Sequence, residues 1–249
     1  MTQIEKYRSF IMTLPPGRLS KERLLVKELL LQEDQDMVIY YVPYDYVNKR
    51  AKVMIIGITP GFTQMELAIR CAREDLLQGV PSDLIDQRAK KLASFAGSMR
   101  KTLIEMLNQI GLPGAIGIES SGLLFEERRD LLHTTSVIRY PVFRQGKNYT
   151  GHSPAILKSD TLYRYAESIL LPELLEVKDA LVIPLGKSVS DVVQVFVDKG
   201  WLSGERCLFE MPHPSGANGH RKKQFEQSRP GMQQQVLKWF SVKRNEREV

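Results

Sequence analysis

The stretch that decides the fold is Lys52 to Ile58, KVMIIGI, which is followed at once by Thr59, Pro60 and Gly61. Almost every residue of this run is apolar, which is typical of a parallel strand buried on both faces. Proline and glycine directly after it predict a turn at the carboxyl end of the strand. In open parallel sheets, ligands bind beyond those ends. The segment therefore predicts a central strand and one edge of a binding site.

Strands and helices alternate along the rest of the chain. Further strands are predicted at residues 131–138, 180–185 and 207–211. Helices are predicted at residues 65–92 (with a break at 79–81), 98–110, 160–176, 187–199 and 221–242. This alternation predicts an α/β fold, a three-layer α/β/α sandwich with a mostly parallel central sheet.

The N-terminal part, residues 1–36, is predicted to be helical, because Ser20 is a suitable N-cap and four leucines after it share one helix face. These leucines are Leu24, Leu25, Leu29 and Leu30. The core is expected over residues 37–242, and the charged tail 243–249 is expected to fray. Because no repeat, low-complexity tract or linker divides the chain, residues 1–249 are predicted to form a single domain.

The composition favours an anionic partner. The 249 residues carry 35 lysines and arginines against 29 acids, a net charge of +6, which makes nucleic acid a reasonable first expectation. Two separated cysteines, Cys71 and Cys207, are too few for a disulfide scaffold or a metal cluster, so we expect reduced thiols, a cytoplasmic protein, no metal and no cofactor. No signal peptide or apolar run of about 18 residues is present, so no membrane association is expected.

A second segment whose residues suit binding and catalysis is MPHPSGANGHR, residues 211–221. Proline fixes the backbone and glycine lets the main chain approach a ligand closely, so this rigid loop is suited to gripping a phosphate backbone. The structural alternative is a polar turn that only starts the last helix. Its histidine, His213, would then merely cap that helix.

The GITPG corner at residues 57–61 and the HPS loop together resemble the two signature motifs of the uracil-DNA glycosylase superfamily. Their order and strand context match those of the family. Between them, Ser94 to Leu112 resembles the family's F-x-G segment, and Thr134 to Pro141 takes the place of the strand that ends in a base-reading asparagine. Residues 174–193 are similar to the penultimate strand and its glycine-started helix, so the resemblance covers about residues 50–240.

The resemblance implies a monofunctional DNA glycosylase that flips out a damaged or modified pyrimidine, either uracil or a C5-substituted base, and hydrolyses its bond to deoxyribose. It implies two catalytic residues: Thr59, which places water, and His213, which donates to the base O2. The implied substrate-binding residues are Ile58, Pro60, Gly61, Phe62, Phe95 (the base-stacking aromatic) and Thr135 (at the base edge). The implied DNA-binding residues are Ser215, Gly216, Ala217, Asn218, His220 and Arg221. The partner would be DNA, bound by a monomer.

The sequence also departs from the family pattern. Ile58 and Thr59 stand where the family carries an acid or amide that positions water, so a threonine hydroxyl, Gln64 or Glu66 would have to substitute. Gly61 stands where the strictest uracil enzymes of the family carry a bulky tyrosine that excludes groups at pyrimidine C5. The resemblance therefore implies that larger C5 groups would be admitted, which would allow a role against foreign DNA.

Two other functions stay open: a noncatalytic nucleic-acid-binding module that keeps the fold, and a hydrolase of free nucleosides or nucleotides. Phe95 could equally be a core residue. The residues 65–92 could be a packing element rather than part of the pocket, and His220 and Arg221 could belong to a solvated helix start.

Overall fold

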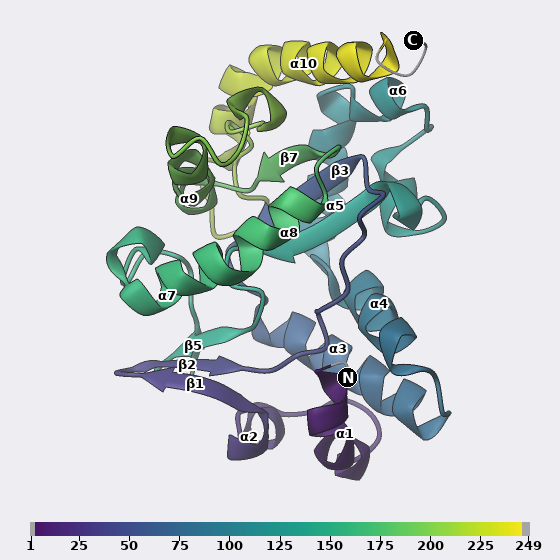
Figure 1. Cartoon of the computed structure of the whole chain (residues 1–249), viewed down its shortest axis with the longest axis vertical. Helices are drawn as coiled ribbons and strands as arrows, with labels where there is room; N and C mark the ends of the chain where they lie inside the picture. The colour runs from purple at the N-terminus through teal and green to yellow at the C-terminus, as the bar shows by residue number, and fades with distance from the viewer. Residues whose placement is uncertain (1–2, 246–249) are drawn as a thin grey trace. The chain divides into compact units, whose positions relative to one another are not determined.

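The computed structural model describes residues 3–245, and the path of the chain is drawn in Figure 1. These residues divide into two compact units. The first unit contains the described residues of Met1–Val47, Ile58–Ala96 and Ser136–Leu170, and the second those of Asn48–Gly57, Gly97–Thr135 and Leu171–Val249. The single domain expected from the sequence stays a prediction.

The second unit is built on a three-stranded sheet in the order β4-β3-β7. Its strands are β3 (Val53–Gly57), β4 (Leu132–Ser136) and β7 (Leu181–Pro184). β3 and β7 run parallel, with Val53 opposite Leu181, and every residue of both strands is buried. The predicted α/β fold with a central parallel sheet is therefore confirmed, with KVMIIGI as its middle strand.

Helices of the second unit lie around this sheet in Figure 1. They are α5 (Ser98–Gln109), α6 (Leu112–Ile116), α8 (Leu171–Glu176), α9 (Lys187–Asp198) and α10 (Arg221–Asn245), with short 3-10 turns η2 (Ser121–Phe125), η3 (Arg129–Leu131) and η6 (Gly204–Arg206). α9 buries Val189, Val192, Val193 and Phe196, the one face that its sequence marks as apolar. α10 continues three residues into the tail that was expected to fray, and residues 246–249 lie outside the described residues.

The first unit contains an antiparallel sheet that the sequence did not predict. Its order is β1 (Leu30–Asp34), β2 (Met37–Tyr40), β5 (Val142–Arg144) and β6 (Lys147–Asn148). Both of its hairpins turn through residues with positive φ: Gln35 at 55° in the first, and Gln145 at 49° with Gly146 at 71° in the second. Such turns are normally signalled by Asn-Gly or Asp-Gly, so glutamine at the turn left the hairpins unmarked.

The helical prediction for residues 1–36 is wrong in its last part. The chain forms α1 (Ile4–Thr13), α2 (Lys21–Leu24) and a 3-10 turn η1 (Lys27–Leu29), and then enters β1. The leucine spacing fits a helix, but pairing of β1 with β2 overrides that local preference.

The helices of the first unit follow the prediction more closely. α3 (Phe62–Leu77) and α4 (Ser82–Ala93) flank the expected break at residues 79–81. After the 3-10 turn η4 (Ile156–Lys158), the predicted helix at 160–176 divides into α7 (Asp160–Tyr165) and a π-helical turn η5 (Ala166–Leu170), followed by α8. Within the described part of the chain, no helix is long and apolar enough to cross a membrane.

The strand predicted at residues 207–211 does not form. Only one parallel bridge, between Cys207 and Val182, links this segment to β7. The amide of Leu208 donates to Val182 at 2.8 Å, and Met211 accepts from the amide of Gly186 at 2.9 Å. Prolines at 212 and 214 lack the N–H groups that would continue a ladder, so the segment follows the sheet as extended loop.

Candidate active site

The corner after β3 is fixed to the segment before β5 by hydrogen bonds within the first unit. Ile58, half-buried, accepts at its carbonyl from the amide of Ile138 at 3.0 Å. The Thr59 hydroxyl donates to the carbonyl of Tyr140 at 2.8 Å and accepts from the amide of Val142 at 3.1 Å. A hydroxyl has one hydrogen and two lone pairs, so in this arrangement Thr59 Oγ1 can accept one more hydrogen bond but donate none.

The corner leads directly into α3. Pro60 is buried, whereas Gly61 and Phe62 are half-buried, and the Lys21 ammonium lies 5.8 Å from the centre of the Phe62 ring. The backbone angles at Gly61, φ −82° and ψ 173°, are ordinary extended values that any residue can adopt. Conformation alone therefore does not require glycine at this position.

The two side chains expected as substitutes for the missing acid are engaged within the first unit. Gln64 Oε1 accepts from the amide of Gly61 at 3.1 Å and so caps the start of α3. Glu66 is buried, and its Oε1 accepts from the amide of Leu19 at 3.2 Å and from Arg70 Nε at 2.9 Å. These hydrogen bonds give both side chains a structural role in α3.

Phe95 follows α4 in the first unit and has an unusual backbone. Its φ is +53°, a conformation that bulky residues rarely adopt, and its side chain is only 6 % exposed. Strained residues of this kind concentrate at functional sites, which is compatible with the stacking role. The burial matches the alternative of a core aromatic, and base stacking by Phe95 stays a prediction.

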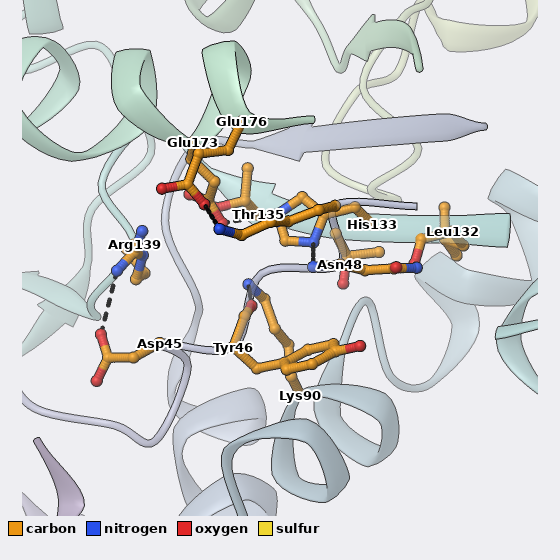
Figure 2. A network of polar contacts seen from close by, with 12 residues as sticks. Asp45, Tyr46, Asn48, Lys90, Leu132, His133, Thr135, Arg139, Glu173 and Glu176 are labelled. Carbon is orange, nitrogen blue, oxygen red and sulfur yellow. Dashed lines mark hydrogen bonds and ion pairs between the residues drawn. The ribbon is translucent and has the colours of Figure 1, made fainter. Parts of the chain in front are cut away.

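Thr135 belongs to a buried polar network of the second unit, shown in Figure 2. Its hydroxyl donates to Glu173 Oε2 at 2.9 Å, and His133 Nε2 lies 2.7 Å from Glu173 Oε1. All three side chains are at most 7 % exposed. The Thr135 hydrogen is thus used by Glu173, which leaves only acceptor capacity for a nucleobase.

The proton of His133 can be assigned from its partners. The amide of Asn48 donates to His133 Nδ1 at 3.3 Å, so in the neutral ring the proton lies on Nε2 and is donated to Glu173. The Asn48 side chain in turn donates to the carbonyls of Asp130 and Leu132, at 2.8 and 3.1 Å. This network anchors β4 to α8 and to the start of the chain segment that leads into β3.

The first unit has its own polar cluster, part of which Figure 2 shows. Asp45 Oδ1 accepts from the Tyr140 hydroxyl at 2.6 Å and from Arg139 NH1 at 3.1 Å, and the Asp45 amide donates to Asp86 at 3.3 Å. Burial, followed by repulsion from Asp45, raises the pKa of the Asp86 carboxyl to about 7. Because Tyr140 also accepts the Thr59 hydroxyl at its carbonyl, the cluster supports the corner.

His213 is held in one orientation by its own loop. The amide of Ser215 donates to His213 Nδ1 at 3.2 Å, so the proton of the neutral ring lies on Nε2. Burial lowers the pKa of His213 to about 4, because desolvation disfavours the charged imidazolium. At neutral pH the residue is therefore a neutral imidazole whose Nε2–H is available as a donor.

The loop approaches the turn between β7 and α9 so closely that only glycine fits there. Gly186 has φ +81°, and a Cβ at this position would lie 2.9 Å from His213 Cβ and 3.4 Å from its backbone nitrogen. The positive φ and the close contact each favour glycine. Gly186 thus places His213, and the sequence identified it only as the residue that starts a helix.

Several predicted DNA-binding residues also build the loop. The amide of Ala217 donates to Ser215 Oγ at 3.2 Å. Asn218 donates from its backbone to the Ser215 carbonyl at 3.1 Å and from its side chain to Gln224 at 3.0 Å. Arg221 NH1 donates to the carbonyls of Pro214 and Ser215, at 2.9 and 2.8 Å. Gly216, Ala217 and His220 are exposed.

The structure therefore groups the predicted site residues by unit. Ile58, Thr59, Pro60, Gly61 and Phe62 lie together at the corner of the first unit. His213 and the loop to Arg221 lie together in the second unit, as does the network around Thr135. Sequence reasoning missed Asn48, His133 and Glu173, and the one available signal was the histidine two residues before Thr135 in a predicted buried strand.

Comparison with known proteins gives three findings. The family model described as the uracil DNA glycosylase superfamily matches residues 44–240. The uncharacterized protein YoxB of Bacillus subtilis (strain 168) is 46% identical over 229 residues, which are 91% of this chain and 90% of that protein. A crystal structure of wild-type SMUG2 from Pedobacter heparinus aligns over 100% of both chains with a TM-score of 0.41 and 12% sequence identity.

Proposed function

Because the chain belongs to the uracil-DNA glycosylase superfamily, we propose that it is a monofunctional DNA glycosylase acting on a damaged or modified pyrimidine, uracil or a C5-substituted base. The target nucleotide is flipped out of the stack, and water cleaves its N-glycosidic bond. The products are a free base and an abasic site. The monomeric state and the cytoplasmic location of the protein stay predictions.

The observation that carries this proposal is the state of His213. Cleavage of the N-glycosidic bond develops positive charge on the sugar and negative charge on the departing base. A donor fixed in advance toward the base oxygen stabilises that negative charge without reorganising. His213 has the required properties, a proton on Nε2 and an orientation set by the Ser215 amide and by the close approach of Gly186. It would donate to O2 of the base.

The corner would position the attacking water rather than act as a general base. Ile58 has no polar side-chain group, and Thr59 Oγ1 can only accept one further hydrogen bond. A water that donates to Thr59 Oγ1 would keep a lone pair for the sugar carbon. Because the bond breaks by departure of the base, the absence of a strong general base need not abolish turnover. Pro60 and Phe62 would line the sugar, and Phe95 and Thr135 would contact the base.

DNA would be held by the loop of the second unit. Gly216, Ala217 and His220 are exposed, and Lys222 and Lys223 add exposed positive charge at the start of α10. Ser215, Asn218 and Arg221 would act partly through the hydrogen bonds that shape the loop. The net charge of +6 supports an electrostatic contribution to DNA binding.

One observation favours a second candidate, a noncatalytic DNA-binding module. The corner has neither a carboxylate nor an amide at Ile58 or Thr59, and the nearby Gln64 and Glu66 are engaged in structure. Such a module would bind DNA and release no base. A hydrolase of free nucleosides, the third expectation, would be insensitive to competing DNA.

The experiment that tests the proposal is a panel of oligonucleotides, each carrying one altered base, incubated with the protein and then treated with alkali. We expect alkali-labile strand breaks at uracil or at a C5-substituted pyrimidine, and inhibition by unmodified competitor DNA. Breaks formed without alkali would contradict monofunctional chemistry. No breaks at any altered base, with DNA binding intact, would favour the binding module. Selective cleavage of bulky C5-substituted bases would support a role against foreign DNA.

A further inference from the structure

The side chain of Asn148 lies at the corner, although it comes from β6, far along the chain. Asn148 Oδ1 accepts a hydrogen bond from the amide of Phe62 at 3.0 Å. A backbone N–H can bond only to the oxygen of a carboxamide, so this contact determines which end of the group is nitrogen. The amino group, Nδ2, therefore lies on the side of Gly61. All three residues belong to the first unit.

Gly61 leaves this amino group uncovered. A Cβ at residue 61 would lie 3.3 Å from Asn148 Nδ2, which is tighter than nine in ten natural Cβ contacts. The backbone angles at Gly61 suit any residue, so the effect of the missing side chain is to leave space beside Asn148 Nδ2. Asn148 is exposed, and none of the hydrogen bonds among the described residues uses its Nδ2.

Two other polar side chains belong to the corner. Thr59 donates its only hydrogen to the Tyr140 carbonyl, so it is not a donor for a ligand. Gln64 keeps its amino group, because its oxygen accepts from the Gly61 amide, but its side chain is half-buried, whereas that of Asn148 is exposed. The Asn148 amino group is neutral and carries two hydrogens, which suits a neutral acceptor such as a carbonyl oxygen. Its orientation is fixed before any ligand arrives, so little rotamer freedom is lost on binding.

We propose that Gly61 and Asn148 form a donor site for a carbonyl oxygen of the target pyrimidine, which makes Asn148 a substrate-binding residue. The inference rests on the proposed function only for the identity of the ligand. It assigns a base contact to a strand that carries none of the family's motifs. It also gives Gly61 a second role besides leaving room at C5, because its missing side chain exposes the donor.

The test compares the affinities of two duplexes by fluorescence anisotropy. One carries a single 2′-fluoro-2′-deoxyuridine, whose fluorine disfavours the positive charge that cleavage places on the sugar, and the other carries only normal bases. We expect the wild-type protein to bind the fluorinated duplex more tightly. Asn148→Asp keeps an acceptor for the Phe62 amide but replaces the donor with a negative group. It should reduce the preference about tenfold.

Two further variants make the test specific. Gly61→Ala places a methyl group against Nδ2 without backbone strain, so it should reduce the preference similarly, and Gly61→Ala combined with Asn148→Asp should lose no more than either change alone. Thr150→Asp puts the same charge on an exposed residue two positions away and should leave the preference intact. Thermal unfolding of each variant checks that the fold is retained.

Three results would overturn the inference. If Asn148→Asp keeps the preference while Asn148→Ala loses it, Asn148 only holds the Phe62 amide. If Asn148→Asp weakens both duplexes equally, the contact is to the backbone rather than the base. If the wild-type protein shows no preference, there is no base site to assign. Base excision is measured separately. If Asn148→Asp releases base as fast as the wild-type protein, only this inference is refuted. If Asn148→Asp loses the preference for the fluorinated duplex but the wild-type protein excises no base, only the proposed glycosylase function is refuted.

Discussion

At the scale of single residues, the proposed chemistry depends most on His213. Its Nδ1 accepts from the Ser215 amide, and its pKa is lowered to about 4 by burial. Prolines on both sides of His213 predicted a stiff loop, whereas its role as a donor to the base came from the family resemblance and stays a prediction. The sequence could not predict the protonation state, since that depends on burial and on which nitrogen the backbone contacts.

The lowered pKa predicts the pH dependence of catalysis. A solvent-exposed histidine changes charge near pH 6.5, but His213 stays neutral until the pH falls to about 4. The single-turnover rate of base excision should therefore show no inflection attributable to His213 between pH 8 and pH 5. A rate change with an apparent pKa near 6.5 that disappears in His213→Gln would contradict this. Circular dichroism at each pH controls for unfolding.

The same reasoning gives a stability prediction for Asp86. Its pKa rises from 3.8 to about 7 on folding, so between these values the folded state holds a proton that the unfolded state has lost. Stability consequently falls as the pH rises through this range and stays reduced above pH 7. Asp86→Asn cannot ionise and keeps an acceptor for the Asp45 amide. At pH 8 it should raise the free energy of unfolding by about 1 to 3 kcal/mol.

The measurement is urea unfolding of both proteins at pH 4 and pH 8. The gain of Asp86→Asn should be present at pH 8 and close to zero at pH 4, where Asp86 is protonated in the folded protein. A gain of equal size at both pH values would show that the effect is not due to ionisation.

At the scale of elements, the sequence predicted the strands and helices whose signals are local and continuous. β3 and β7 are short, wholly apolar runs, and α9 has a single apolar face. The antiparallel sheet of the first unit was missed because Gln35 and Gln145 occupy turn positions that usually carry asparagine or aspartate. β1 was mistaken for helix, because four leucines happened to follow helical spacing while the real partner, β2, pairs through the backbone.

The β7–α9 turn gives a prediction at this scale. Gly186→Ala adds a Cβ that would lie 2.9 Å from His213 Cβ, on a backbone with φ +81°. We expect a loss of about 1 to 3 kcal/mol of stability and at least about a tenfold loss of excision rate as His213 is displaced. Gly200→Ala is the matched control, because Gly200 has φ +71° but no atom within 4 Å of its added Cβ.

The control should lose stability and keep the excision rate. Equal losses of rate in both variants would mean that backbone strain, and not the contact with His213, determines activity. Both rates are measured well below the unfolding temperature of the weaker variant.

At the scale of the whole molecule, net charge and composition predicted the class of partner but not the residues that meet it. The charge of +6 is spread over the chain, and several basic side chains are used internally, such as Arg206, which donates to the carbonyls of Ala180 and Leu174. Family membership could be predicted from the ordered motifs of one chain. Asn148 could not, because hairpin geometry brings it to the corner and no motif marks it.

Electrostatic binding gives a prediction for the protein as a whole. If Lys222 and Lys223 contact phosphates, replacing both with alanine should reduce the slope of log K against log salt by about 1.8 for duplex DNA. Lys158→Ala combined with Lys178→Ala makes the same change of net charge at exposed lysines outside the loop. This control should leave the slope unchanged within error. Equal reductions in both proteins would point to overall charge and not to a local contact.

The most direct test of the central claim is the single-turnover release of free base by the wild-type protein, His213→Ala and His152→Ala, with DNA affinity measured on the same samples. His152 is an exposed histidine outside the proposed machinery. We predict that His213→Ala loses base release by about 100-fold or more while binding DNA nearly as tightly, and that His152→Ala behaves as wild type. Base release by His213→Ala at the wild-type rate would contradict the account.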